Sequence, residues 1–210
     1  MGCFVAAGLC PAAAFCAGLG TTLDRARFPA ELLIVQGDLQ RLTFSDRLSS
    51  DERLGLEGRI GSALGGLEWL ALEHEALSQS TVSRDALQGL QESWSARDLS
   101  SALEWVSGLT WDHALNARIF SPERATPDDV QRVREIDARL CQGCHVDSVG
   151  TEKRLPAYRL QKMGKMISAG EFLARLLSGV RGTADTALAN PLSLGDIRGF
   201  MKFYRDSPAD

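Results

Sequence analysis

The sequence predicts an all-α protein in two parts. Apolar residues recur three and four positions apart through most of the 210-residue chain, which is the spacing of one helix face. Ser or Thr precedes several of these stretches with an acidic residue three positions later, as is typical of a helix N-terminus. We therefore expect an N-terminal segment, a helical domain, a linker and a second helical domain, over residues 1–20, 21–110, 111–125 and 126–210.

The first 20 residues carry no charged side chain and are rich in Ala and Gly. Such an apolar run with small residues near its end is typical of a secretory signal peptide, so we expect a periplasmic or secreted protein. The first basic residue is Arg25, which leaves two alternatives, a start further upstream or a retained anchor. The run is short for a spanning helix and contains Pro11, so membrane association is expected only if residues 1–20 are retained.

Residues 21–110 are expected to form helices that pack through apolar faces. Residues 21–29 are predicted to be a short mature N-terminus, and a helix is predicted over 30–44. Ser50 is the expected cap of a second helix, whose first turn is acidic. Its buried face is predicted to comprise Leu56, Ile60, Leu64, Leu67 and Leu70 or Ala71.

Glycines are unusually frequent in this second helix, where each costs about 1 kcal/mol relative to Ala. They indicate either close helix–helix contact or a break into two shorter helices, and they lie at Gly55, Gly58, Gly61, Gly65 and Gly66. Further helices are predicted over 81–90 and 95–106, with Trp94 and Trp105 in the core. Residues 107–126 are predicted to be a loop, and residues 21–110 contain no metal or catalytic motif.

The second domain is predicted to begin at Thr126-Pro127-Asp128-Asp129, which combines an N-cap, a Pro at the first helical position and two acids. This helix is expected to run to about Cys141 with its apolar face at Val130, Val133, Ile136 and Leu140. Later helices are predicted over 160–166, 168–180 and 192–205, the last two capped by Ser168 and Ser193. Their expected buried residues are Phe172, Leu173, Leu176, Leu177, Val180, Ile197, Phe200, Met201 and Tyr204.

The motif Cys141-Gln142-Gly143-Cys144-His145 reads C-x-x-C-H, the attachment sequence for a c-type haem. Two thiols separated by two residues can each bond one vinyl group of a single porphyrin, and the histidine then supplies the proximal iron ligand. A zinc half-site would need a second pair of ligands, and a redox dithiol would need a βαβ context. If residues 1–20 are removed, only Cys141 and Cys144 remain of the five cysteines, which agrees with export.

Residues 126–210 resemble a class I cytochrome c domain. The resemblance rests on a helix that leads into C-x-x-C-H, a loop containing Pro156, a middle helix, and a terminal helix with Phe203 and Tyr204. It implies one covalently attached haem c packed between crossing first and last helices. It also implies transfer of single electrons rather than catalysis, by this chain alone or as a subunit of an oxidoreductase. An assembly subunit, docked through residues 21–125, is a further alternative.

The sixth iron ligand is the point of departure from that family. Members usually place a Met before the terminal helix, but residues 183–191 contain none, and Leu188 lies about where it is expected. We expect Met166 or Met163 to supply the ligand, with Met201 in the core. The alternatives are His113 or His74, or an open site that would bind or sense a diatomic gas.

The net charge of −4 gives no case for nucleic-acid binding. Residues 151–182 are nevertheless basic, with only two acids, Glu152 and Glu171. We expect this strip to dock a redox partner protein with an acidic face, because opposite charges speed encounter. The alternative is a solvated face with one or two partners for haem propionates. The basic residues are Lys153, Arg154, Arg159, Lys162, Lys165, Arg175 and Arg181.

Overall fold

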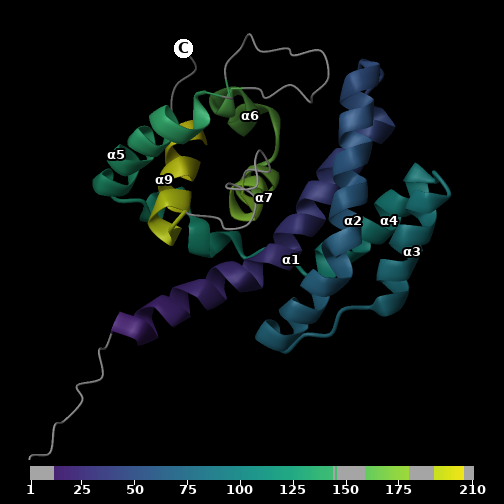
Figure 1. Ribbon diagram of the computed structural model, residues 1–210, viewed down its shortest axis with the longest axis horizontal. Helices are drawn as coiled ribbons and strands as arrows, with labels where there is room; N and C mark the ends of the chain where they lie inside the picture. Colours follow the sequence, from purple (N-terminus) through teal and green to yellow (C-terminus); the bar gives the residue numbers. More distant parts are fainter. Residues whose placement is uncertain (1–11, 144, 146–158, 180–191, 206–210) are drawn as a thin grey trace, which may run out of the picture.

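The computed structural model describes residues 12–143, 145, 159–179 and 192–205, and within these ranges every regular element is a helix (Figure 1). The prediction of an all-α protein is therefore confirmed. None of the helices in these ranges is long and apolar enough to cross a membrane. The division into domains stays a prediction, and the expected structures of residues 1–11, 147–158 and 181–190 lie outside the described part.

The first helix, α1 (Ala12–Phe44), is far longer than the helix predicted over 30–44, because it also includes residues 21–29. Pro29 lies inside α1, although proline removes a backbone hydrogen bond and costs about 3 kcal/mol within a helix. Packing offsets this cost, because Phe28 is 1% exposed and Ala30 is fully buried. Local sequence signals contain no information about such contacts.

The second helix, α2 (Ser50–Ser78), is one continuous element, so of the two alternatives for its glycines the break into two shorter helices is wrong. Its cap is Ser49 rather than Ser50, and Ser49 and Glu52 form a reciprocal capping box. Most of its glycines make no close helix contact either, since an added Cβ would meet nothing within 4 Å at Gly58, Gly65 or Gly66. The predicted apolar face is buried at Leu56, Ile60, Leu64, Leu67 and Ala71.

Two shorter helices follow, α3 (Arg84–Ser95) and α4 (Leu99–Asp112), each displaced towards the C-terminus from its predicted range. Asp98 caps α4, which extends into the predicted loop. Trp94 is half-buried, but Trp105 is 42% exposed and is not the core residue that we expected. The linker contains two 3-10 turns, η1 (Ala117–Phe120) and η2 (Pro122–Arg124).

The C-terminal part consists of α5 (Pro127–Ile136), the π-helical turn η3 (Asp137–Cys141), α6 (Leu160–Met166), α7 (Ala169–Ser178) and α9 (Leu194–Arg205). The caps at Thr126, Ser168 and Ser193 and the bounds of α6 are as predicted. Helices α5 and α9 pack closely, because a Cβ on Gly199 would lie 2.8 Å from the carbonyl oxygen of Asp129. Only glycine permits this approach.

Apolar side chains form two clusters. The N-terminal cluster is built from α1–α4 around Leu32, Val35, Ile60, Leu67 and Leu90. The C-terminal cluster is built around Phe120, Val133, Phe172, Ile197, Phe200 and Tyr204. Helix α1 contributes to both, since Ala26, Ala30 and Ile34 lie in the C-terminal cluster and Phe28, Leu32 and Val35 in the N-terminal one. Figure 1 shows α1 passing between the two groups of helices.

A network of charged side chains reinforces this junction. Asp38 of α1 is fully buried and accepts hydrogen bonds from Arg59 of α2 and Arg175 of α7, each at 2.6 Å from Oδ1. Arg41 and Arg175 both donate to Glu171. Burial alone would raise the pKa of Asp38, but the hydrogen bond from Arg59 and the surrounding arginine charges hold that pKa below its usual range.

Candidate functional site

The predicted attachment motif lies where the first helix of the C-terminal part ends. Cys141 is the last residue of η3 and is half-buried against the C-terminal cluster. The backbone N–H of His145 donates to the carbonyl oxygen of Cys141 at 2.9 Å, so these two residues lie one helical turn apart. Cys144 lies outside the described residues.

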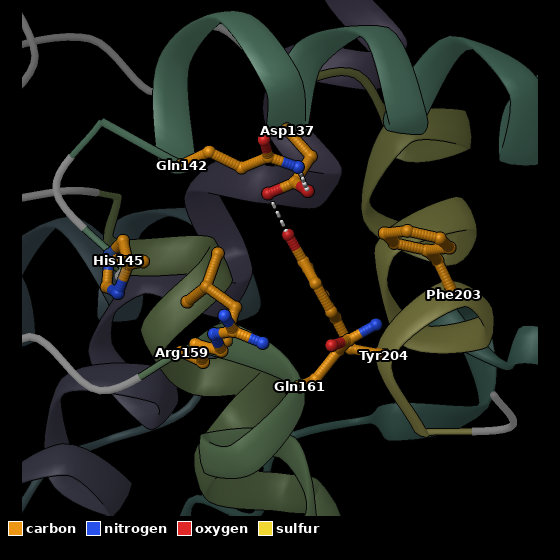
Figure 2. A pocket seen from close by; sticks show the side chains of 8 residues that line it. Asp137, Gln142, His145, Arg159, Gln161, Phe203 and Tyr204 are labelled. Atoms are coloured by element: carbon orange, nitrogen blue, oxygen red, sulfur yellow. Dashed lines mark hydrogen bonds between the residues drawn. The ribbon is translucent and has the colours of Figure 1, made fainter. Parts of the chain in front are cut away.

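His145 faces a cavity of about 280 Å³ (Figure 2). This volume is close to the lower end of the range for small-molecule pockets, about 300–1,000 Å³. The wall is formed by residues from η3, the motif, the start of α6 and the end of α9. They are Asp137, Gln142, His145, Arg159, Leu160, Gln161, Phe203 and Tyr204.

The π-helical turn sets which side chains face this cavity. Val133 is buried as predicted and Ile136 is half-buried, but after them the extra residue per turn replaces the predicted Leu140 on the inner face by Asp137 and Cys141. Leu140 is consequently 67% exposed, and Asp137 is only 7% exposed. The prediction of Leu140 on the buried face is therefore wrong, because it assumed a regular helix.

Asp137 joins three elements at the cavity wall. The Tyr204 hydroxyl of α9 donates to Asp137 Oδ1, and Gln142 Nε2 of the motif donates to Asp137 Oδ2 at 3.0 Å. Burial raises the pKa of Tyr204, and the hydrogen bond to Asp137 and its negative charge raise it further. The Tyr204 hydroxyl therefore stays protonated, and its ring packs against Phe172, Phe200 and Phe203.

Sequence reasoning did not identify Asp137 or Tyr204 as site residues. They are 67 positions apart, so no local pattern joins them. One signal was available, since Asp137 lies four residues after Val133 and four before Cys141. A carboxylate in this register on a helix that leads into the motif could have been read as a buried polar group.

The two methionines predicted as sixth ligands do not line this cavity. Met163 is half-buried against the C-terminal cluster, and Met166, at the end of α6, is 61% exposed. Met201 is 5% exposed within the C-terminal cluster, as expected of a core residue. Leu188 lies outside the described residues, and the ligand assignment stays a prediction.

The alternative ligands, His74 and His113, face each other instead. Their ring centroids are 5.3 Å apart, each ring also contacts Phe28, and each residue is 8% exposed. Burial lowers the pKa of both imidazoles, and His113 lowers that of His74 further. The backbone of Arg25 acts against this lowering of the His74 pKa. Because Pro29 has no N–H, the Arg25 carbonyl lacks its helical donor, which explains why α1 offers a polar group here.

The basic side chains of residues 151–182 differ in their exposure. Arg159, Lys162 and Lys165 are exposed, whereas the Arg175 side chain is 16% exposed and pairs with Asp38 and Glu171. Arg175 therefore serves the buried network and is excluded from any docking surface. Lys153, Arg154 and Arg181 lie outside the described residues.

The described residues fit a covalently held haem in their chemistry. A thiol and an imidazole lie one turn apart, the imidazole faces a cavity, and the Tyr204 and Phe203 rings contribute to its wall. Leu160 adds a third apolar side chain to this wall, and the remaining lining residues are polar or charged. The described part of the chain contains no cluster of three or more His, Cys, Asp or Glu that could hold a metal ion by itself.

Comparison of the chain with known protein families, with curated proteins and with solved structures finds no match.

Proposed function

We propose that the chain is a periplasmic or secreted mono-haem c-type cytochrome that transfers single electrons. The observation that carries the proposal is the position of the motif. Cys141 and His145 lie one turn apart at the end of a capped helix, and His145 faces a cavity with aromatic side chains in its wall. Of the chemistries that C-x-x-C-H serves, haem attachment uses all three reactive side chains.

We further propose that residues 126–210 have the class I cytochrome c fold. Two observations support this assignment. Helix α5 leads directly through η3 into the motif, and α5 packs against the terminal helix α9 with a glycine, Gly199, at the closest approach. Both are what the resemblance implies for the first and last helices of that domain.

Each residue of the site has a separate role in this proposal. Cys141 and Cys144 each form one thioether, in which the S–H bond breaks and a vinyl group gains one C–S and one C–H bond. When bound, haem supplies an iron that cycles between the ferric and ferrous states. His145 supplies the proximal nitrogen, and the C-terminal cluster behind Cys141 excludes water. Arg159, in the cavity wall, is a candidate partner for a haem carboxylate.

The proposed partner is a redox protein with an acidic docking face. Lys162 and Lys165 lie exposed on α6, and Arg159 lies exposed directly before it. Opposite charges speed encounter and lose their effect as salt rises. The association rate with such a partner is therefore expected to fall with ionic strength.

A second candidate function is binding or sensing of a diatomic gas. One observation favours it, since neither Met163 nor Met166 lines the cavity that His145 faces. An iron without a sixth protein ligand would leave a coordination position open to such a gas.

The optical spectrum of the matured protein, with and without carbon monoxide, tests these two functions against each other. An electron carrier with a thioether ligand is expected to show the weak near-infrared charge-transfer band and no shift with carbon monoxide. Met163→Leu or Met166→Leu would then abolish that band, which identifies the ligand. A high-spin spectrum with rapid carbon monoxide binding would instead favour the gas-binding function.

A further inference from the structure

Three aspartates are buried in the described part of the chain, and they differ in how their negative charge is compensated. Asp38 pairs with Arg59 and Arg175, and Asp196 pairs with Arg132, whose Nε lies 2.9 Å from Oδ1. Asp137 is buried as well, but its hydrogen-bond donors, Tyr204 and Gln142, are both uncharged. A buried carboxylate without a cationic partner is costly unless both oxygens are hydrogen-bonded, and both oxygens of Asp137 are.

These donors hold Asp137 at the cavity. Asp137, Gln142, His145 and Tyr204 all line its wall, and Figure 2 shows the Tyr204 hydroxyl pointing at the Asp137 carboxylate across from His145. Asp137 also binds Gln142 twice, through the side chain and through its carbonyl oxygen, which accepts the Gln142 backbone N–H at 3.0 Å. Gln142 directly follows Cys141, so these bonds fix the first half of the attachment motif.

A fixed negative charge beside a redox centre favours the more positive of its two states. Inside a protein the effect is stronger than in water, because less solvent screens the charge. Local charge, hydrogen bonding and burial are among the factors by which a protein sets the potential of a haem.

We propose that the negative charge of Asp137, held in place by Tyr204 and Gln142, lowers the reduction potential of a haem on His145. This inference rests on the proposed function. It assigns to the Asp137–Tyr204 pair a role distinct from that of the arginine-paired aspartates, whose charges are neutralised locally. The proposal concerns the charge of Asp137 and requires no change in its protonation during electron transfer.

The test is a potentiometric titration of the matured full-length protein and its Asp137→Asn variant. Removing the charge is expected to shift the ferric-to-ferrous ratio at a fixed potential on the order of tenfold towards ferrous. A tenfold shift corresponds to a potential about 59 mV higher for a one-electron couple. The matched control is Asp128→Asn, which removes an exposed carboxylate from the first turn of α5 and is expected to leave the potential nearly unchanged.

A second variant keeps the test decisive if Asp137→Asn fails to fold. Tyr204→Phe retains the aromatic contacts with Phe172 and Phe200 but removes one donor. The carboxylate then keeps its charge but loses the compensating O–H dipole, so a smaller shift in the opposite direction, to a lower potential, is expected. The denaturation midpoint of each variant, measured without haem after Cys141 and Cys144 are replaced by Ala, separates structural loss from an effect on potential.

The possible outcomes are distinct. A wild-type protein without covalent haem would overturn the proposed function itself. If the wild type carries haem, a higher potential in Asp137→Asn than in Asp128→Asn supports the inference. Equal potentials in these two variants would overturn the inference. If Asp137→Asn also has a lower denaturation midpoint with an unchanged potential, then Asp137 is only structural.

Discussion

The N-terminal and C-terminal clusters are both helical cores, yet they are built differently. The N-terminal cluster consists largely of Leu, Ile, Val and Ala side chains from α1–α4. The C-terminal cluster combines residues of α1 with side chains of α5, α7 and α9, is rich in aromatic rings, and borders the cavity that His145 faces. The two regions thus differ in composition, and of the two clusters the C-terminal one lies beside the attachment motif.

Helix α1 links the two regions in two ways. Its apolar faces enter both clusters, and its Asp38 lies in the charged network that reaches α2 and α7. At Gly37 a Cβ would lie 2.5 Å from Glu171 Cδ, so the backbone of α1 directly meets this network. The C-terminal part therefore depends on the N-terminal helices for part of its core.

The largest expected effect is obtained by removing the buried charge that joins the regions. Asp38→Asn leaves Arg59 and Arg175 without their shared carboxylate, and breaking a buried pair in this way costs about 3–5 kcal/mol. The free energy of unfolding, measured by denaturant titration, is expected to fall by this amount. Glu57→Gln is the control, because it breaks the exposed pair with Arg97, worth about 0–1 kcal/mol. Similar losses in both variants would contradict the account.

A smaller effect on stability is expected at two glycines, one in each region. Replacing them by Ala is expected to change stability in opposite directions. Gly199→Ala places a methyl group 2.8 Å from Val133 Cγ2 and from the Asp129 carbonyl oxygen. Overpacking of this kind is expected to destabilise the protein by about 1–2 kcal/mol after the helix preference of Ala is counted. Gly65→Ala on α2 meets nothing within 4 Å and is expected to stabilise by up to ~1 kcal/mol. Thermal unfolding of both variants checks the opposite signs.

The smallest effect is a pH dependence that belongs to the N-terminal region. Burial lowers the pKa of His74 and His113 in the folded state, so the unfolded chain binds protons more readily. Their neutral forms therefore contribute stability above the unfolded pKa of about 6.5, and this contribution is lost as the pH falls through the lower folded values. Glu75 and Asp112 act against the shift without reversing it.

Denaturant titrations between pH 7 and 5 measure this contribution. Replacing both residues, in His74→Phe/His113→Phe, keeps ring contacts with Phe28 and is expected to flatten the dependence over that range. His145 is present in both proteins and cancels in the comparison. An equally steep loss of stability in the variant would show that other groups cause it.

Local signals predicted much of the C-terminal part. The caps at Thr126, Ser168 and Ser193 depend on residues within three positions of one another, and all three appear where expected. The motif was also readable, since Cys141, Cys144 and His145 are contiguous. At Ser168 the side chain accepts from the Glu171 backbone N–H as an N-cap does, while the Glu171 carboxylate accepts from Arg41 and Arg175.

Non-local contacts account for what the sequence could not predict. The continuity of α1 through Pro29 depends on burial between two groups of helices, and the Asp38–Arg175 pair spans 137 positions. The π-helical turn has no sequence signal that we recognise, yet it decides that Asp137 rather than Leu140 is buried. A hydrogen bond between two elements, such as that from Tyr204 to Asp137, becomes visible only once the helices are packed.

The intact mass of the unfolded chain tests the central claim most directly, after expression with a c-type cytochrome maturation system. The account predicts one species heavier by a single haem, which withstands denaturation because both thioethers are covalent. Cys141→Ala/Cys144→Ala is expected to lose that mass completely while still folding through its helices. A wild-type chain that emerges with the bare mass of its sequence would contradict the assignment of the motif.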